Sequence, residues 1–252
     1  MNHDIGHRQF PDLADALGHH PYTAIPTHLL RRGPCRAYAD GSLPRFGAAV
    51  VQDAAAADEP AAFGDDARAI WRLLQEAPEW ECVSVPAHVA EELAAIIRRE
   101  RGVDVRFYTD IYFRLTRPAP ACPHPHVRLL TRDDAALLGS APEELRRYGF
   151  GGAEGMLSHG HATGAVVDGS IVAIAQAYAR TGVYADIGLA AVDTYRRRRY
   201  ATSAAALVIG QVQAEGETPV WSAGEDNHAS MRVAEKLGFE RCGERTYVIP
   251  TG

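Results

Sequence analysis

The chain has 252 residues and a formal net charge of -6, so it can bury a sizeable core in one large domain or two ordinary ones. The acidic balance argues against a general nucleic-acid binder, and Cys35, Cys82, Cys122 and Cys242 contain no Cys-x-x-Cys pair, which excludes a zinc ribbon and leaves no metal site predicted. No secretory leader and no apolar run of roughly 20 residues is seen, so we expect a cytoplasmic protein that does not bind membranes.

The first half of the chain reads as a mixed α/β domain. Apolar residues at helical spacing and short β-rich runs alternate there, and Pro86 and Gly102 suit the start and stop of one helix. The expected elements are a strand at 47–52, a helix at 65–77, a strand at 81–85, a helix at 86–102 and a strand pattern in two parts over 103–115.

A proline-rich stretch separates the two halves. Prolines at 118, 120, 123 and 125 remove backbone donors and disfavour helix before each one. We therefore predict three segments: an N-terminal α/β domain at 1–116, a linker at 117–126 and a second domain at 127–252.

The sequence pattern of the second half predicts ten elements in the order β, α, α, β, β, β, α, β, α, β. Thr131 and Asp134 resemble a capping box, and Asp168-Gly169 is a strong hairpin signal. The expected elements are a strand at 127–130, a helix from 131, a helical piece at 142–150, a loop at 149–155, two strands within 162–179, a strand at 183–192, an alanine-rich helix to about 215, a strand at 218–224, a helix at 227–238 and a strand pair over 239–250.

Residues 194–206, TYRRRRYATSAAA, place the densest positive charge immediately before the alanine-rich helix. The first turn of a helix has unpaired N–H groups and partial positive charge, and small residues let a phosphate approach the backbone. This segment therefore predicts a pyrophosphate site. The alternative is a solvated basic turn, which is what most charge runs are.

The segment ADIGLAAVDTYRRRRYATSAAALVI, followed by WSAGEDNHASMRVAEKLGF, resembles the cofactor-binding part of the GNAT superfamily of acyl-CoA-dependent N-acyltransferases. The family shows Arg/Gln-x-x-Gly-x-Gly/Ala opening one helix and Asn-x-x-Ala/Ser on a second helix that ends in Lys-x-Gly-Phe. The matching residues are Arg196, Tyr200 and Ala201, then Asn227, Ser230, Lys236, Gly238 and Phe239. Within the superfamily, the residues of the second motif are most similar to those of the zwittermicin-resistance-type branch.

The resemblance implies a mixed, mostly antiparallel sheet flanked by helices, with acetyl-CoA as cofactor and a small-molecule amine as acceptor. Under it, the backbone of Leu189, Ala190 and Ala191 pairs with the pantetheine arm, and Asn227 and Ser230 support the cofactor from the next helix. In the plainer interpretation Asn227 is simply a helix N-cap. The pyrophosphate is held by the turn made of Arg196, Arg197, Arg198, Arg199, Tyr200, Ala201 and Thr202.

Two positions depart from the family pattern. Arg199 replaces the second glycine, where a side chain crowds the phosphates or demands a strained φ. Ala234 occupies the place where the family often has a tyrosine general acid. Cofactor binding and proton transfer are the two steps that these departures affect.

Catalysis is then assigned to Asp186, as the base, and to Tyr184, which alternates onto the same strand face and positions substrate or serves as the acid. Asp186 lies among apolar neighbours, where burial raises the pKa of a carboxyl. Its plainer role is to satisfy buried backbone or pair with an arginine. His159, His161 and Ser222 are weaker candidates for the acceptor rim and the thioester sulfur.

The N-terminal elements from residue 47 repeat the order of residues 184–249, so we expect a degenerate partial copy of the same fold. Three functional hypotheses follow: an acetyltransferase acting on a small amine, a non-catalytic acyl-CoA sensor or remnant, and a nucleotide or nucleic-acid binding module that uses the arginine turn. The net charge and the lack of interleaved aromatic residues disfavour the third. A homodimer is compatible with any of them.

Overall fold

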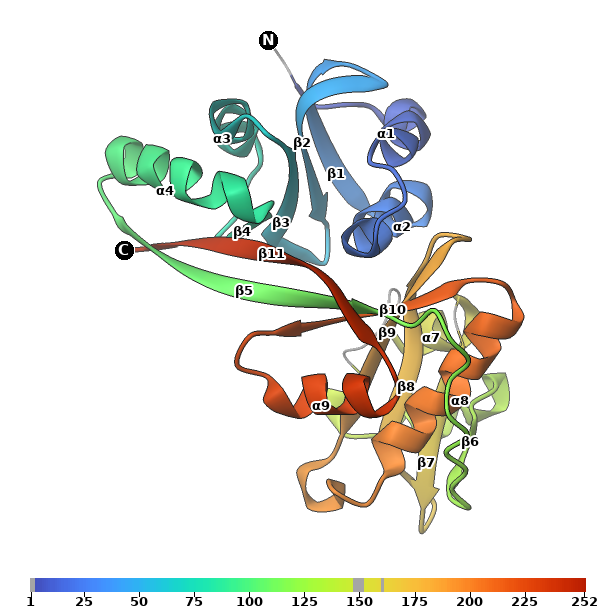
Figure 1. Ribbon diagram of the computed structural model, residues 1–252. Helices are drawn as coiled ribbons and strands as arrows, with labels where there is room; N and C mark the ends of the chain where they lie inside the picture. Colours follow the sequence, from blue (N-terminus) through green and yellow to red (C-terminus); the bar gives the residue numbers. More distant parts are fainter. Residues whose placement is uncertain (1–2, 147–151, 160) are drawn as a thin grey trace. The chain divides into compact units, whose positions relative to one another are not determined.

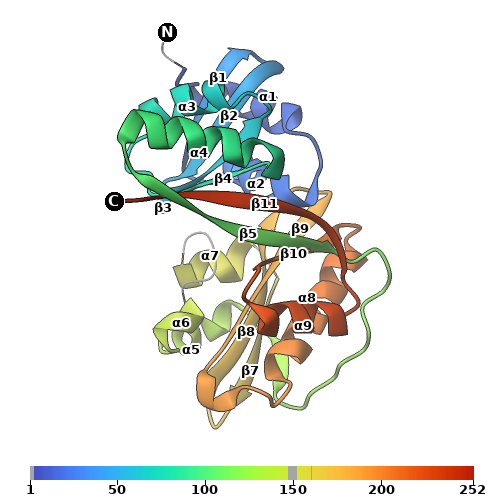
Figure 2. The same ribbon diagram turned by 60° about the vertical axis from the view of Figure 1, so that its left-hand side comes forward.

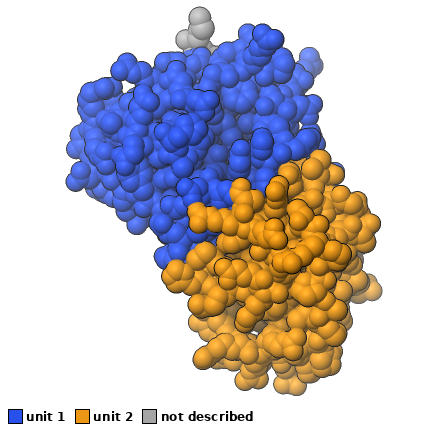
Figure 3. All heavy atoms as spheres, viewed as in Figure 1, with its two compact units in different colours: residues 1–112, 223–226, 243–252 blue, residues 113–222, 227–242 orange. Residues whose placement is uncertain are grey.

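The computed structural model of the protein describes residues 3–146, 152–159 and 161–252. The chain forms two compact units (Figure 3). Unit 1 contains Met1–Tyr112, Ala223–Asp226 and Gly243–Gly252, and unit 2 contains Phe113–Ser222 and Asn227–Cys242. None of the described helices is long and apolar enough to cross a membrane.

Unit 1 is built on a sheet with the strand order β1-β2-β3-β4-β11-β5 (Figure 1). β1, β2 and β3 pair antiparallel, and β3 then pairs parallel with β4. In chain order its elements are α1 (Phe10–Ala16), α2 (Ala24–Arg32), β1 (Cys35–Ser42), β2 (Arg45–Asp53), β3 (Ala56–Gly64), α3 (Ala67–Glu76), β4 (Val83–Val85), α4 (Ala87–Arg101) and β5 (Asp104–Arg114), and β11 (Glu240–Thr251) adds its later residues.

The core of unit 1 lies between its sheet and the helices α3 and α4. Ala48 and Val50 of β2 pack with Ile70 of α3 and Leu93 of α4 in one buried cluster. β2 is buried continuously from residue 48 to 52, because α2 packs against the same strand as α3 does. A strand covered on both faces loses the polar alternation of a half-exposed strand.

Unit 2 contains the sheet order β10-β9-β8-β7-β6, with β9 and β10 parallel and the other pairs antiparallel. In chain order its elements are β6 (Val127–Leu129), α5 (Ala135–Gly139), α6 (Glu143–Arg146), α7 (Gly152–His159), β7 (Ala162–Val167), β8 (Ser170–Arg180), β9 (Tyr184–Ala191), α8 (Tyr200–Ala214), β10 (Thr218–Gly224) and α9 (His228–Lys236). Short 3-10 turns precede α5 and α8, at Arg132–Asp134 and Asp193–Tyr195.

Two helical layers cover opposite faces of the sheet in unit 2. Leu138, Leu145 and Met156 from α5, α6 and α7 pack with Ile174 of β8, and Ala190 of β9 lies against this cluster. Ala191, the next residue of β9, instead packs with Tyr200 at the start of α8. Because successive strand residues face opposite ways, the even-numbered residues of β9 face α5–α7 and the odd-numbered ones face α8.

The two halves of the chain repeat one arrangement. Each has three antiparallel strands, a helix, a strand parallel to the third strand, a second helix and a final long strand, so β3-α3-β4-α4-β5 corresponds to β9-α8-β10-α9-β11. The expected degenerate partial copy is therefore consistent with the fold. The predicted alignment was wrong in one respect, because the counterpart of β9 is β3 and not the strand at 47–52.

The final strands are exchanged between the halves. β11, the last strand of the chain, pairs antiparallel with β4, where Tyr247 stands opposite Ser84. β5, the last strand of the first half, lies beside β10, and the N–H of Leu115 donates to the carbonyl of Pro219 at 3.0 Å. Figure 2 shows β5 and β11 running side by side. The compact units are discontinuous for this reason, whereas the boundaries at 1–116, 117–126 and 127–252 stay a prediction.

Most predicted elements are confirmed, and the differences have physical causes. β5 and β11 are single strands and not pairs, and α1, α2, β1 and β3 were not predicted. β3 has the sequence AADEPAAFG, in which two acids and a proline hide the strand pattern although its later residues are buried. Residues 152–155 begin α7 and are not a loop. The predicted helical end and loop at 147–151 lie outside the described residues.

Candidate functional site

The parallel strands β9 and β10 stay paired for only part of their length. Their register joins Tyr184 to Thr218 and ends at the pair Asp186 and Val220. β9 continues to Ala191, paired with β8 on one edge, and no described strand pairs with its other edge beyond Asp186. Residues 187–191 therefore offer backbone N–H and C=O groups to an extended ligand, and Leu189, Ala190 and Ala191 lie in this stretch.

The open edge of β9 leads directly to the start of α8. The first helical bond of α8 runs from the N–H of Ser203 to the carbonyl of Arg199 at 2.9 Å, and no side chain of the described residues caps the helix. No described residue accepts a hydrogen bond from the N–H groups of 197–202. Unpaired N–H groups at the positive end of a 15-residue helix form an anion site.

The backbone of this turn is strained. Arg197 has φ 62° and Arg199 has φ 67°, in the left-handed region that favours glycine. The sequence expectation that Arg199 demands an unfavourable φ is therefore confirmed. Residues held in this region by their surroundings concentrate at ligand clamps, and alternating turns of this kind direct successive N–H groups to one point.

The four arginine side chains are exposed and take different partners. Arg196 forms an ion pair with Asp193 at 2.7 Å, and the guanidinium of Arg198 lies 5.4 Å from the centre of the Tyr195 ring. Arg199 donates to the sulfur of Cys122 at 3.2 Å. Arg197 has no described partner, which leaves its charge available to a ligand.

Cys122 lies on the proline-rich stretch, against α8. Its thiol also contacts the Ser203 hydroxyl at 3.5 Å. Although its burial acts in the opposite direction, the contacts with Ser203 and Arg199 and the Arg199 charge hold the pKa of Cys122 below the ordinary value. The same stretch is fixed further along by Gln213, which accepts from the N–H of Ala119 at 3.0 Å and donates to the Arg117 carbonyl at 2.8 Å.

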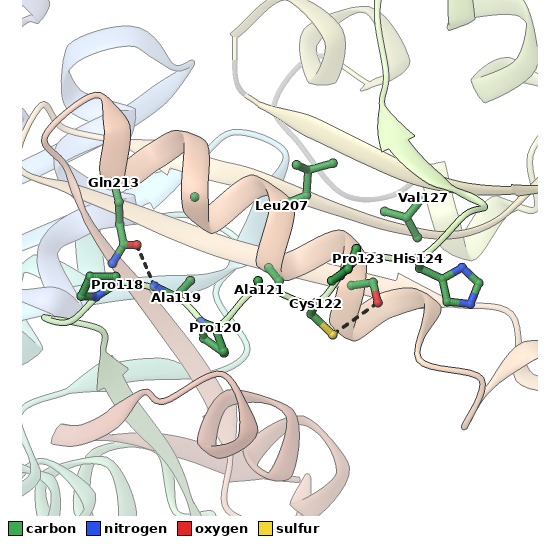
Figure 4. Close-up of a pocket in the computed structure, with 13 residues that line it drawn as sticks. Pro118, Ala119, Pro120, Ala121, Cys122, Pro123, His124, Val127, Leu207 and Gln213 are labelled. Carbon is green, nitrogen blue, oxygen red and sulfur yellow. Dashed lines mark hydrogen bonds between the residues drawn. The ribbon is translucent and has the colours of Figure 1, made fainter.

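A pocket of about 570 Å³ lies between this stretch and the outer side of α8 (Figure 4). Ser203, Leu207 and Gln213 line it, together with Cys122, whereas the opposite side of α8 packs on the sheet. Asp186 belongs to the sheet, so the pocket is not the place where the predicted chemistry would occur.

Asn227 and Ser230 open the helix that follows β10. The Asn227 side chain accepts from the N–H of Ser230 at 3.1 Å, so the plainer role of N-cap is confirmed. The Ser230 hydroxyl accepts from the indole of Trp221 at 2.9 Å and thereby ties α9 to β10. Their contacts with a cofactor stay a prediction.

Asp186 and Tyr184 share the face of β9 that is directed toward α5–α7. Asp186 is 6% exposed and is the last residue of β9 that pairs with β10. A buried carboxylate therefore lies where the two strands separate. Tyr184 is partly exposed two residues earlier. Buried carboxylates beside an open strand edge suit proton abstraction.

Gln176 of β8 is a residue that the sequence interpretation missed. It is 2% exposed and is the partner of Gly188, the next residue on the Asp186 face of β9. A glutamine among the alanines and isoleucines of a buried strand is the signal that identifies it. Ser222 lies in β10, two residues beyond the last pair.

His161 takes part in a charged network and precedes Ala162, the β7 residue that pairs with Gln176. Its Nε2 lies 2.6 Å from Glu215, which also pairs with Arg180 at 2.5 Å. Arg180 in turn binds the buried Glu217 at 2.6 Å. His159 ends α7, and its side chain lies outside the described residues. Among the described residues, no group of three metal-ligating side chains gathers.

The corresponding places in unit 1 are occupied. Asp66 caps α3, accepting from the N–H groups of Arg68 and Ala69 at 2.8 and 3.0 Å, so an acid stands where α8 has an open turn. β3 and β4 pair only at Ala61 and Ser84. Beyond that pair the buried Arg245 joins both strands, donating to the carbonyls of Ala62 and Ser84 at 2.6 and 2.8 Å.

Comparison with known proteins points to one family. Residues 141–248 match the model of the GNAT acetyltransferase family. No curated protein sequence matches the chain significantly.

Solved structures share the fold over nearly the whole chain. A GCN5-related N-acetyltransferase-like protein from Streptococcus suis aligns with a TM-score of 0.71 at 20% identity, covering 97% of this chain and 99% of that one. A GNAT-family acetyltransferase from Colwellia psychrerythraea aligns with a TM-score of 0.57 at 12% identity, covering 99% and 98%. A tandem GNAT protein from the clavulanic acid biosynthesis pathway gives 0.58 at 17% identity, covering 99% and 98%.

The fold is thus the mixed α/β fold of GNAT structures, with a large, mostly antiparallel sheet flanked by helices. The match to the GNAT acetyltransferase family model covers residues 141–248, less than half of the chain, and the structural neighbours share the fold over nearly all of it. The zwittermicin-resistance-type branch stays a prediction.

Proposed function

We propose that the protein is an acyl-CoA-dependent N-acyltransferase that transfers acetyl from acetyl-CoA to an amine of a small molecule. The observation that carries this proposal is the continuity of the open β9 edge with the uncapped start of α8. An extended arm fits the edge from Ala191 back to Ile187, and a pyrophosphate fits the turn at 197–202. The described residues of unit 1 show no comparable continuity, because Asp66 and Arg245 fill both places.

Bound acetyl-CoA would supply an activated acetyl group as its thioester. Asp186 would accept the proton that the amine loses, directly or through water, because its carboxylate lies where β9 and β10 separate. Tyr184 would orient the acceptor or return a proton to the thiolate. Ala234, which is fully buried, has no hydroxyl for that second task.

The proposal is tested first by binding. Titration with acetyl-CoA should stabilise the protein against heat, while ATP and duplex DNA should leave the melting temperature unchanged. Stabilisation by ATP or DNA alone would support the nucleotide-binding alternative instead. Thiol release from acetyl-CoA is then measured with a panel of primary amines.

Asp186→Asn provides the catalytic test, with Asp168→Asn on the exposed hairpin turn as a control for the same loss of charge. We expect Asp186→Asn to reduce turnover about 100-fold or more with little change in acetyl-CoA affinity. Unchanged turnover removes Asp186 from the role of base. Tight acetyl-CoA binding without thiol release for any amine supports the alternative, a non-catalytic acyl-CoA sensor.

A further inference from the structure

Gln176 carries a buried hydrogen-bond donor that no described residue satisfies. Its side-chain nitrogen, Nε2, is shielded from solvent and has no partner within the described part of the chain. Folding removes this N–H group from water without replacing its acceptor, which costs free energy. Such a group in a well-packed strand is explained when a ligand supplies the acceptor.

Small residues are the strand partners of Gln176. Its partners in the neighbouring strands are Ala162 of β7 and Gly188 of β9, so small residues flank it on both sides. Antiparallel partners face the same way, which places Gln176 on the face of Asp186. The two are diagonal neighbours on β8 and β9, beside the register shift between Ala177 and Ala179.

This position lies next to the separation of β9 and β10. β9 and β10 are last paired at Asp186. Gly188 follows on the open stretch and adds no side chain between Asp186 and Ala190 on that face. A ligand whose reactive end lies at this point would therefore have Asp186 and Gln176 on the same side.

Only one of the reacting groups can accept a hydrogen bond from the Gln176 amide. An amide N–H requires an acceptor, and the attacking amine must keep its lone pair for the carbon. The carbonyl oxygen of the acyl group has lone pairs available and gains negative charge as the C–N bond forms. The C–S bond then breaks with its electron pair going to sulfur, and the amine proton passes to the base.

We propose that Nε2 of Gln176 donates a hydrogen bond to the acyl carbonyl oxygen of the bound acyl-CoA. This inference rests on the proposed function and adds a donor that recognises the acyl group itself. This hydrogen bond makes the site bind acetyl-CoA more tightly than free coenzyme A. The residues of the pyrophosphate turn contact a part that both ligands share, so they cannot make this distinction.

The test compares Gln176→Met with the unmodified protein. Methionine has a similar length and no donor, so the variant removes the hydrogen bond while keeping the volume. Isothermal titration gives the dissociation constants for acetyl-CoA and for coenzyme A. In Gln176→Met, we expect the dissociation constant for acetyl-CoA, divided by that for coenzyme A, to rise about five-fold, with coenzyme A affinity unchanged.

Gln52→Met is the matched control. Gln52 is equally buried, but its Nε2 donates to the carbonyls of Ala57 and Pro78 at 2.6 and 2.5 Å. That variant should lower the melting temperature and leave the ratio unchanged, whereas Gln176→Met should not lower the melting temperature. An unchanged ratio in Gln176→Met overturns the inference, as does a drop in stability with both affinities reduced equally. Failure of the unmodified protein to bind either ligand overturns the proposed function instead.

Discussion

Arg199→Gly and Arg199→Ala separate backbone strain from the loss of a guanidinium group. Both variants remove the contact with Cys122, and only the glycine variant relieves the φ of 67°. A left-handed conformation costs a residue with a Cβ roughly 1–2 kcal/mol. Glycine has more conformational entropy in the unfolded chain, which offsets part of the relieved strain. We therefore expect Arg199→Gly to be about 1 kcal/mol more stable than Arg199→Ala.

Thermal unfolding without ligand measures this difference. For a protein of this size, about 1 kcal/mol corresponds to a shift of roughly 2–4 °C in the melting temperature. Equal melting temperatures, or a lower one for Arg199→Gly, would refute the argument that the turn is strained. Because the N–H groups form the proposed anion site, Arg199→Gly should also bind coenzyme A at least as tightly as Arg199→Ala.

Two further predictions concern titratable groups. At pH 7.5, iodoacetamide should modify Cys122 first, because its pKa is lowered, whereas burial raises the pKa of Cys35 to about 11 and that of Cys82 to about 12. Mass spectrometry follows the modification, and a faster reaction of Cys35 or Cys82 would contradict this prediction. Burial, followed by the charge of Glu59, raises the pKa of Asp110 from 3.8 to about 6. The folded state then holds a proton that the unfolded state has lost, so stability falls as the pH rises from about 4 to about 6. Asp110→Asn should remove that fall in urea unfolding midpoints, and parallel curves for both proteins would exclude the effect.

The fold was predictable where a local pattern coincides with tertiary structure. The helices at 65–77 and 86–102 and the hairpin at Asp168-Gly169 carry periodic apolar residues or turn chemistry of their own. β1 and β3 do not, because β1 contains the polar sequence DGS and β3 contains DEP. The exchange of β5 and β11 leaves no local signal, because the partner of a strand is decided by residues more than 100 positions away.

The candidate site divides in the same way. The arginine turn and Asn227 are adjacent in sequence to the helices they open, so the sequence alone could predict where they lie. Gln176 depends on its pairing with Gly188 and on the lack of an acceptor, and Arg245 depends on the carbonyls of β3 and β4. These are properties of strand register and burial, and no single stretch of sequence contains them.

The exchanged strands make each half of the chain depend on the other for a strand of its sheet. A protein truncated after residue 222 would lose Arg245 together with the strand that completes β4, and one beginning at residue 127 would lose the strand beside β10. Deletion of either half therefore removes a strand from the sheet of the half that remains. Each copy serves the other as a permanent structural subunit carried on the same polypeptide.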